Sequence, residues 1–166
     1  MTGAQTDIIT HIDVANSLGR RGAARFAAIQ ALYQLEMGGA ASLEPILMEY
    51  LTIRGHQTSD GIRLGAFDTA LMEHVVRGVV ENFEDIDIML LGVMADGWTI
   101  DRLDSVLRAI LRAATYELAW DEETPGPVII NEYVNIARTF FNDREPGFVN
   151  ASLDSIQSVM RSPDQP

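Results

Sequence analysis

The chain has 166 residues, of which 47% are hydrophobic, and a formal net charge of −12 at pH 7. Its length and apolar content suffice for one globular domain with its own core. It has no cysteine, which excludes disulfides, thiolate nucleophiles and thiolate zinc sites. No apolar run reaches the roughly 20 residues that cross a bilayer. The acidic balance argues against a general nucleic-acid binder, so any RNA binding must rest on a local cluster of its arginines.

The two ends of the chain are weakly patterned. Residues 1–18 carry no basic flank before a short apolar stretch, so they do not resemble a secretory signal. We expect a flexible N-terminal arm over 1–18, a single domain over 19–161, a frayed tail over 162–166, and a cytoplasmic location.

Apolar residues recur with a helical period in seven segments between these ends. Glycine stops the first segment, and Asp68 and Pro127 are suited to helix starts. No segment alternates as a strand does, and residues 54–66 have the composition of a loop. The sequence therefore predicts an all-α fold, a compact bundle of about seven helices. The expected helices span about 23–37 (after Gly19-Arg20-Arg21-Gly22), 43–51, 68–83, 85–93, 101–119, 127–141 and 147–160.

The segment 101–119 has the clearest period. Asp104, Arg108 and Arg112 are spaced four apart on one side of it, with the acid first. This order favours ion pairs along a helix face.

Residues with catalytic or metal-binding chemistry are sparse. His11, His56 and His74 each lack a second ligand at helical spacing. The acid pairs Asp85/Asp87 and Glu122-Glu123 are typical of helix ends and solvated surfaces. We therefore expect no enzyme activity, no metal and no cofactor.

An arginine cluster opens the first helix. Arg21 and Arg25 are four residues apart, and Ile29 and Tyr33 continue the same ridge. With Arg20, this ridge predicts an accessible face, on which arginine binds phosphate and tyrosine stacks on a base. The alternative is a solvated helix start with a half-buried tyrosine.

Phe148 lies one residue off the apolar stripe of the last helix, at the edge of a polar face. An exposed aromatic residue there can stack on a base. The alternative is a boundary residue packed against Phe140 or Phe141. The Asn150 amide could contact a base edge or bond to the backbone of the preceding turn.

Four stretches, in this order, resemble the NusB family. The resemblance covers about Arg20 to Ile156, with weaker support from Asp68 to Val79 and from Gly97-Trp98. The stretches are Arg20-Arg21 through Arg25 to Gln30-Ala31-Leu32-Tyr33, Leu107 to Leu118 with Arg108, Pro125 with Val128-Ile129-Ile130-Asn131-Glu132 to Phe140, and Phe148-Val149-Asn150 with Leu153-Asp154.

The resemblance implies two packed three-helix bundles with an extra helix. It also implies transcription antitermination, through binding of boxA, a short single-stranded element in nascent RNA, together with the small-subunit ribosomal protein NusE. Other Nus factors and RNA polymerase would join indirectly, chiefly in ribosomal RNA operons. By position, the RNA contacts would be Arg20, Arg21, Arg25, Tyr33, Arg108, Phe148 and Asn150, with Tyr33 also facing NusE. Asn131 and Glu132 would order the helix start after Pro127.

Two features keep alternatives open. Gly22 and Ala23 thin the arginine run, and with the acidic charge this predicts weak RNA affinity without NusE. The same charge favours an alternative function, a protein-binding helical adaptor without RNA contact of its own. A methyltransferase fused to such a domain would need a long extension beyond Pro166. Both a monomer and a homodimer are compatible with the sequence.

Overall fold

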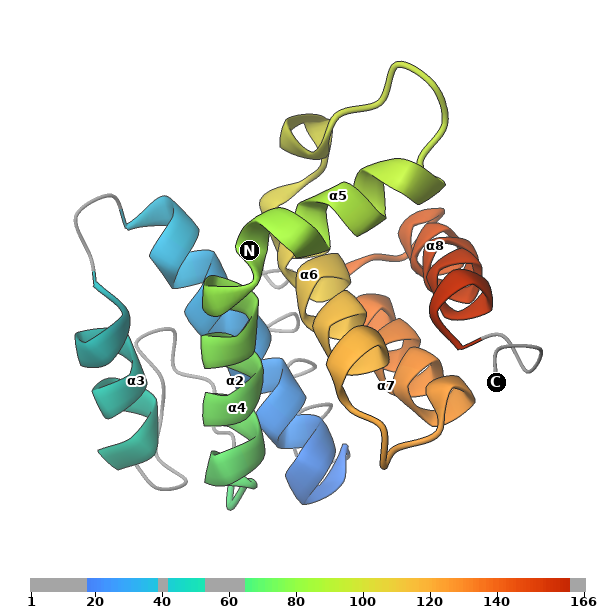
Figure 1. Cartoon of the computed structure of the whole chain (residues 1–166). Coiled ribbons are helices and arrows are strands. Elements are labelled where there is room, and N and C mark those ends of the chain that lie inside the picture. Colours follow the sequence, from blue (N-terminus) through green and yellow to red (C-terminus); the bar gives the residue numbers. More distant parts are fainter. Residues whose placement is uncertain (1–17, 39–41, 53–64, 162–166) are drawn as a thin grey trace, which may run out of the picture. The chain divides into compact units, whose positions relative to one another are not determined.

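The computed structural model describes residues 18–38, 42–52 and 65–161. Within these ranges the chain forms seven α-helices and one short 3-10 helix, with no strand (Figure 1). The predicted all-α class is confirmed. The expected N-terminal arm, the expected tail and most of the predicted loop at 54–66 lie outside the described residues.

The helix boundaries agree with the sequence prediction to within a few residues. Phe83 was expected to end the third segment, but it begins the next helix instead, because the chain turns at Asn82. Likewise the segment predicted at 101–119 is divided into a 3-10 turn and a longer helix. The elements are α2 (Gly19–Met37), α3 (Leu43–Thr52), α4 (Thr69–Glu81), α5 (Phe83–Val93), η1 (Ile100–Arg102), α6 (Ser105–Trp120), α7 (Gly126–Phe140) and α8 (Glu145–Met160).

The chain divides into two compact units, residues 1–76 and residues 77–166. The boundary falls inside α4. The expectation of one domain over 19–161 stays a prediction.

In the first unit, α2 packs against α3. The Gln34 side-chain amide donates a hydrogen bond to the Tyr50 hydroxyl, 3.1 Å away, and so links these two helices. The predicted helix start at Asp68 is confirmed, because its carboxylate accepts a 3.0 Å hydrogen bond from the Leu71 backbone N–H. Such an N-cap contributes about 1 kcal/mol to stability. The Asp68 N–H in turn donates to the Arg20 carbonyl at 3.1 Å, which holds the start of α4 against the start of α2.

In the second unit, α6, α7 and α8 pack pairwise, and α5 packs against α6 and α8 (Figure 1). Aliphatic side chains at helical spacing fill the space between them. Asp104 is the N-cap of α6 and accepts hydrogen bonds from the backbone N–H groups of Val106 and Leu107 at 2.9 and 3.3 Å. The fully buried aliphatic residues include Ile86, Leu90, Ile110, Leu111, Ile129, Ile136, Val149 and Leu153.

The end of α8 is tied to the end of α6 by one arginine. The Arg161 guanidinium donates to the carbonyls of Leu118 at 2.9 Å and Thr124 at 2.8 Å, and to that of Asp121. These carbonyls lie at the negative end of the α6 dipole, where a cation is favourable. Burial raises the pKa of the Asp121 carboxyl, but hydrogen bonds from Thr124 and from the Glu123 N–H, together with the Arg161 charge, outweigh it and leave that pKa below its usual value.

Candidate nucleic-acid interface

Two exposed arginines stand at the start of α2. Arg20 and Arg21 are both exposed, and the first turn of α2 contains no acidic residue and no side-chain cap. Among the described residues neither guanidinium has an ion-pair partner. Cations at a helix N-terminus oppose the helix dipole. Helix stability therefore does not explain this pair.

The rest of the predicted ridge is only partly accessible. Arg25 is 2% exposed and Ile29 is 1% exposed, so the expectation of an accessible face at these two positions is wrong. The reason is that every residue of α2 from Gly22 to Leu32 is buried, so this helix has no solvated side there. The role of Arg25 toward RNA stays a prediction.

Tyr33 is the first exposed residue after this buried stretch, with 37% of its surface exposed. It lies 12 residues beyond Arg21, which corresponds to about 18 Å along the helix at 1.5 Å per residue. The accessible parts of the ridge are therefore its two ends, and Tyr33 cannot touch the same phosphate as the arginine pair.

The two predicted RNA contacts on α8 face different sides of the helix. Phe148 is half-buried and Asn150 is exposed. Residues two apart on a helix differ by about 200° in direction. Phe148 was expected at the edge of a polar face, but Ser152, one turn farther along α8, is 6% exposed and belongs to the core side. One flat surface cannot present both predicted side chains.

Arg108 is half-buried and is engaged by the backbone before its helix. Its guanidinium donates to the carbonyls of Leu103 at 2.6 Å and Asp101 at 3.2 Å. These bonds hold η1 and the following turn against α6. An RNA contact by Arg108 stays a prediction. Part of the hydrogen-bond donor capacity of this guanidinium is already used by the two carbonyls.

The acid-first spacing of Asp104, Arg108 and Arg112 leads to a different set of partners. Asp104 caps α6, whereas Arg112 is buried and forms a two-pronged ion pair with Asp87 of α5, at 2.9 and 3.0 Å. Asp87 was expected to be a dipole and solubility feature of the helix start. Its pairing depends on a partner 25 residues away, which spacing along one helix cannot show.

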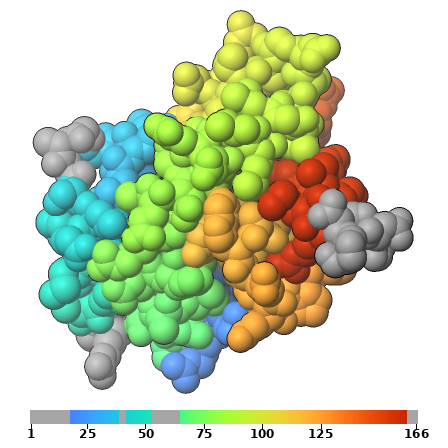
Figure 2. Space-filling view, viewed as in Figure 1, coloured from blue at the N-terminus to red at the C-terminus, as the bar shows by residue number. Residues whose placement is uncertain are grey.

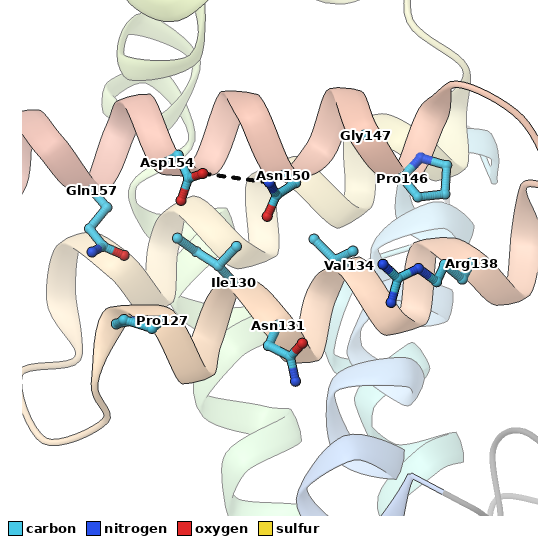
Figure 3. Close-up of a pocket in the computed structure, with 10 residues that line it drawn as sticks. All are labelled: Pro127, Ile130, Asn131, Val134, Arg138, Pro146, Gly147, Asn150, Asp154 and Gln157. Atoms are coloured by element: carbon cyan, nitrogen blue, oxygen red, sulfur yellow. Dashed lines mark hydrogen bonds between the residues drawn. The ribbon is translucent and has the colours of Figure 1, made fainter.

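A groove lies between α7 and α8, with a volume of about 450 Å³ (Figure 3). Asn131 was expected to order the start of α7, but its side chain is exposed and lines this groove instead. Asn150 also lines the groove and was predicted as an RNA contact, whereas Arg138, Asp154 and Gln157 were missed by sequence reasoning, although the polar residues of α8 recur three or four residues apart. Its walls are Pro127, Ile130, Asn131, Val134 and Arg138 from α7, and Pro146, Gly147, Asn150, Asp154 and Gln157 from α8.

Neither a metal site nor a membrane-spanning helix is found among the described residues. No group of three or more His, Cys, Asp or Glu residues in the described ranges could hold a metal ion. His74 is exposed on α4, whereas His11 and His56 lie outside the described residues. None of the helices described is long and apolar enough to cross a membrane.

Known proteins resemble the chain in both sequence and fold. Transcription antitermination protein NusB of Sinorhizobium medicae is 44% identical over 144 residues, covering 87% of this chain and 89% of the relative. The same-named protein of Sinorhizobium fredii is 45% identical over 142 residues, covering 86% and 88%.

Among solved structures, NusB of T. maritima matches with a TM-score of 0.68 and 31% identity over 83% of this chain and 90% of that one. A chain in the crystal structure of the antitermination factors NusB and NusE in complex with dsRNA shares the fold, with a TM-score of 0.68 at 21% identity, covering 83% of this chain and 96% of that chain. The model of the NusB family matches residues 22–158. The chain belongs to the NusB family.

Proposed function

We propose that this chain is a transcription antitermination factor that binds a boxA-type single-stranded RNA together with NusE, and that it is not an enzyme. The observation that carries the RNA part is the exposed Arg20 and Arg21 pair on a helix start without acidic residues. The names of the relatives support the antitermination part. Such a function would be carried out in the cytoplasm.

Each predicted contact has a distinct chemical role in this proposal. Arg20 and Arg21 bind phosphates, since guanidinium groups form paired hydrogen bonds with phosphate oxygens. Phe148 stacks on a base, and Asn150 bonds to a base edge. Tyr33 lies farther along α2, where it contacts RNA and NusE. Arg25 and Arg108 remain candidates for phosphate contact, but burial of the first and backbone bonding of the second make them weaker ones.

The need for NusE follows from charge. With a net charge of −12, the body of the chain repels RNA at long range. A basic partner is attracted to the same body and supplies further phosphate contacts. RNA polymerase and other Nus factors would then join indirectly.

Removing both exposed arginines of α2 tests the RNA site. The Arg20→Ala/Arg21→Ala variant should bind boxA RNA more weakly, because two phosphate contacts are lost. The slope of log K against log salt should fall by about 1.4, since each contact to a single strand contributes about 0.7. Fluorescence anisotropy at several salt concentrations, with NusE present, measures both quantities.

The matched control for this pair is Arg102→Ala, which removes an exposed cation of η1. It should leave the salt slope nearly unchanged. If the control and the double variant lowered the RNA affinity and the salt slope alike, the α2 arginines would contribute only through the overall charge of the protein and not through specific phosphate contacts.

Phe148→Ala should weaken RNA binding by about 1–3 kcal/mol, the usual range for loss of one base–aromatic stack. Binding of NusE, measured by calorimetry without RNA, should not change. If NusE binding were lost while RNA binding stayed the same, the start of α8 would belong to the protein interface.

One observation favours the alternative of a protein-binding adaptor. On α5, which is at the surface in Figure 2, Ile88 and Leu91 are 67% and 47% exposed, and the exposed Glu84 and Asp85 lie one turn before Ile88. An apolar patch with acidic neighbours suits a basic protein partner. This function predicts a NusE complex that forms normally while neither boxA nor scrambled RNA binds.

A further inference from the structure

We infer that the groove between α7 and α8 holds one nucleotide of the bound RNA, with its base against the groove amides and its phosphate on Arg138. This inference rests on the proposed function and extends it, because four of the five polar residues involved were not predicted to contact RNA.

The groove has the hydrogen-bonding groups that a base edge needs. Asn131 on α7 and Asn150 and Gln157 on α8 supply amides that both donate and accept, and Asp154 supplies a carboxylate acceptor. A base edge presents donors and acceptors side by side, and amide and carboxylate side chains are the usual partners for such edges.

Part of this hydrogen-bonding capacity is unused. The buried Gln157 Oε1 has no hydrogen-bond partner among the described residues. The Asn150 amide donates to Asp154 at 3.5 Å, which is at the limit of a hydrogen bond. Figure 3 shows these three side chains in a row along α8, facing α7. A buried acceptor without a donor is unfavourable, so the Gln157 amide gains if it turns from its place beside Gly126 to meet a ligand amino group.

Arg138 stands at the other end of the groove, beside Pro146 and Gly147 (Figure 3). Its side chain is exposed, and one of its N–H groups donates to the side-chain Oδ1 of Asn135 at 2.9 Å. A guanidinium has five N–H donors, so it can hold a phosphate oxygen pair in addition. A Cβ built on Gly147 would meet nothing within 4 Å, so this end of the groove is open to a backbone.

The groove is a poor fit for a protein partner. Its aliphatic floor residues Ile130 and Val134 are only 5% and 6% exposed, which leaves little apolar surface for the buried anchor that a protein interface needs. Arg138 and Asp154 carry opposite charges, so the lining residues provide no net charge to attract a basic protein. A base needs only edge contacts and a flat wall.

The directions of Phe148 and Asn150 agree with this placement. Since the two side chains leave α8 on different sides, a strand that stacks on Phe148 and inserts a base beside Asn150 must pass around the start of α8. The groove then receives the nucleotide next to the stacked one.

A scan with abasic RNA tests the inference on the full chain with NusE present. A set of boxA RNAs, each lacking one base, is titrated against the wild type and against Asn131→Ala and Gln157→Leu. For the wild type, one missing base should weaken binding about tenfold. For both variants, removing that same base should weaken binding by less than about twofold, whereas removing any other base should weaken binding as much as it does for the wild type. This pattern is the signature of a direct contact between the side chain and that base.

Two further variants separate the phosphate from the base. Arg138→Gln should lower the affinity for every RNA in the set and reduce the salt slope by about 0.7. The control Ser155→Ala, an exposed α8 residue that does not line the groove, should leave all values unchanged.

The outcomes distinguish this inference from the function on which it rests. If the wild type binds boxA RNA but the groove variants show the same loss of affinity as the wild type for every abasic RNA, the groove inference is overturned and the proposed function stands. Variants that lose NusE and keep RNA binding overturn it too, because the groove is then a protein site. If no RNA binds at all, the proposed function fails with it.

Discussion

Asp87→Ala is expected to lower the free energy of unfolding by about 2–4 kcal/mol. The Asp87 and Arg112 side chains are 23% and 10% exposed, and the Arg112 Nε lies 2.9 Å from the carboxylate. The guanidinium carbon of Arg112 also lies 4.3 Å from the centre of the Phe83 ring. Removing the acid leaves a buried cation without its principal counter-charge, which is more unfavourable than losing an exposed ion pair.

Urea denaturation followed by circular dichroism measures this effect. Asp85→Ala removes an exposed acid from the same helix and should change stability by less than about 1 kcal/mol, the usual size of a helix-dipole interaction. An equal, small loss for both variants would contradict the assignment of the buried pair as a link between α5 and α6.

Gly78→Ala is expected to destabilise the fold by about 1–3 kcal/mol, although alanine favours helices over glycine by up to about 1 kcal/mol. A Cβ at Gly78 of α4 would lie 1.9 Å from the Cζ of the Tyr116 ring. That ring is 6% exposed and stacks on Trp120 with centroids 5.4 Å apart. The ring therefore has little room to move aside, and the clash must shift the backbone.

Gly92→Ala is the matched control for this variant. Gly92 is also helical, but a Cβ there meets nothing within 4 Å. This variant should gain about 0.5–1 kcal/mol from helix propensity alone. If the free energy of unfolding falls for Gly78→Ala and rises for Gly92→Ala in the same urea assay, the close approach of α4 and Tyr116 is supported. A rise for both variants would contradict it.

The helices could be predicted from the sequence because their signals are local. The stripe from Leu107 to Leu118 repeats at helical spacing, and Asp68 precedes such a stripe as a capping residue does. Neither signal depends on what the helix packs against. The fold class and most helix boundaries could therefore be predicted without any knowledge of tertiary contacts.

Accessibility could not be predicted in the same way. In α2 every residue from Gly22 to Leu32 is buried, so Arg25 is buried although its spacing from Arg21 suggested a shared exposed ridge. A helical period indicates which residues share a face, but it does not say that the opposite face is solvated.

The groove residues illustrate the same limit. Asn131 and Arg138 on α7, and Asp154 and Gln157 on α8, form a site only because the two helices pack together. Each alone is an ordinary polar residue on an amphipathic helix. Asn150 was predicted through the family resemblance, and its neighbours across the groove could be found only from the structure.

The most direct test of the central claim is a titration of fluorescently labelled boxA RNA with this chain, with and without NusE, against a scrambled RNA at the same salt concentration. The account predicts weak binding by the chain alone, and tighter binding to boxA than to the scrambled RNA once NusE is present. Equal affinity for both RNAs, or no RNA binding while a NusE complex still forms, would contradict it and favour the protein-binding adaptor.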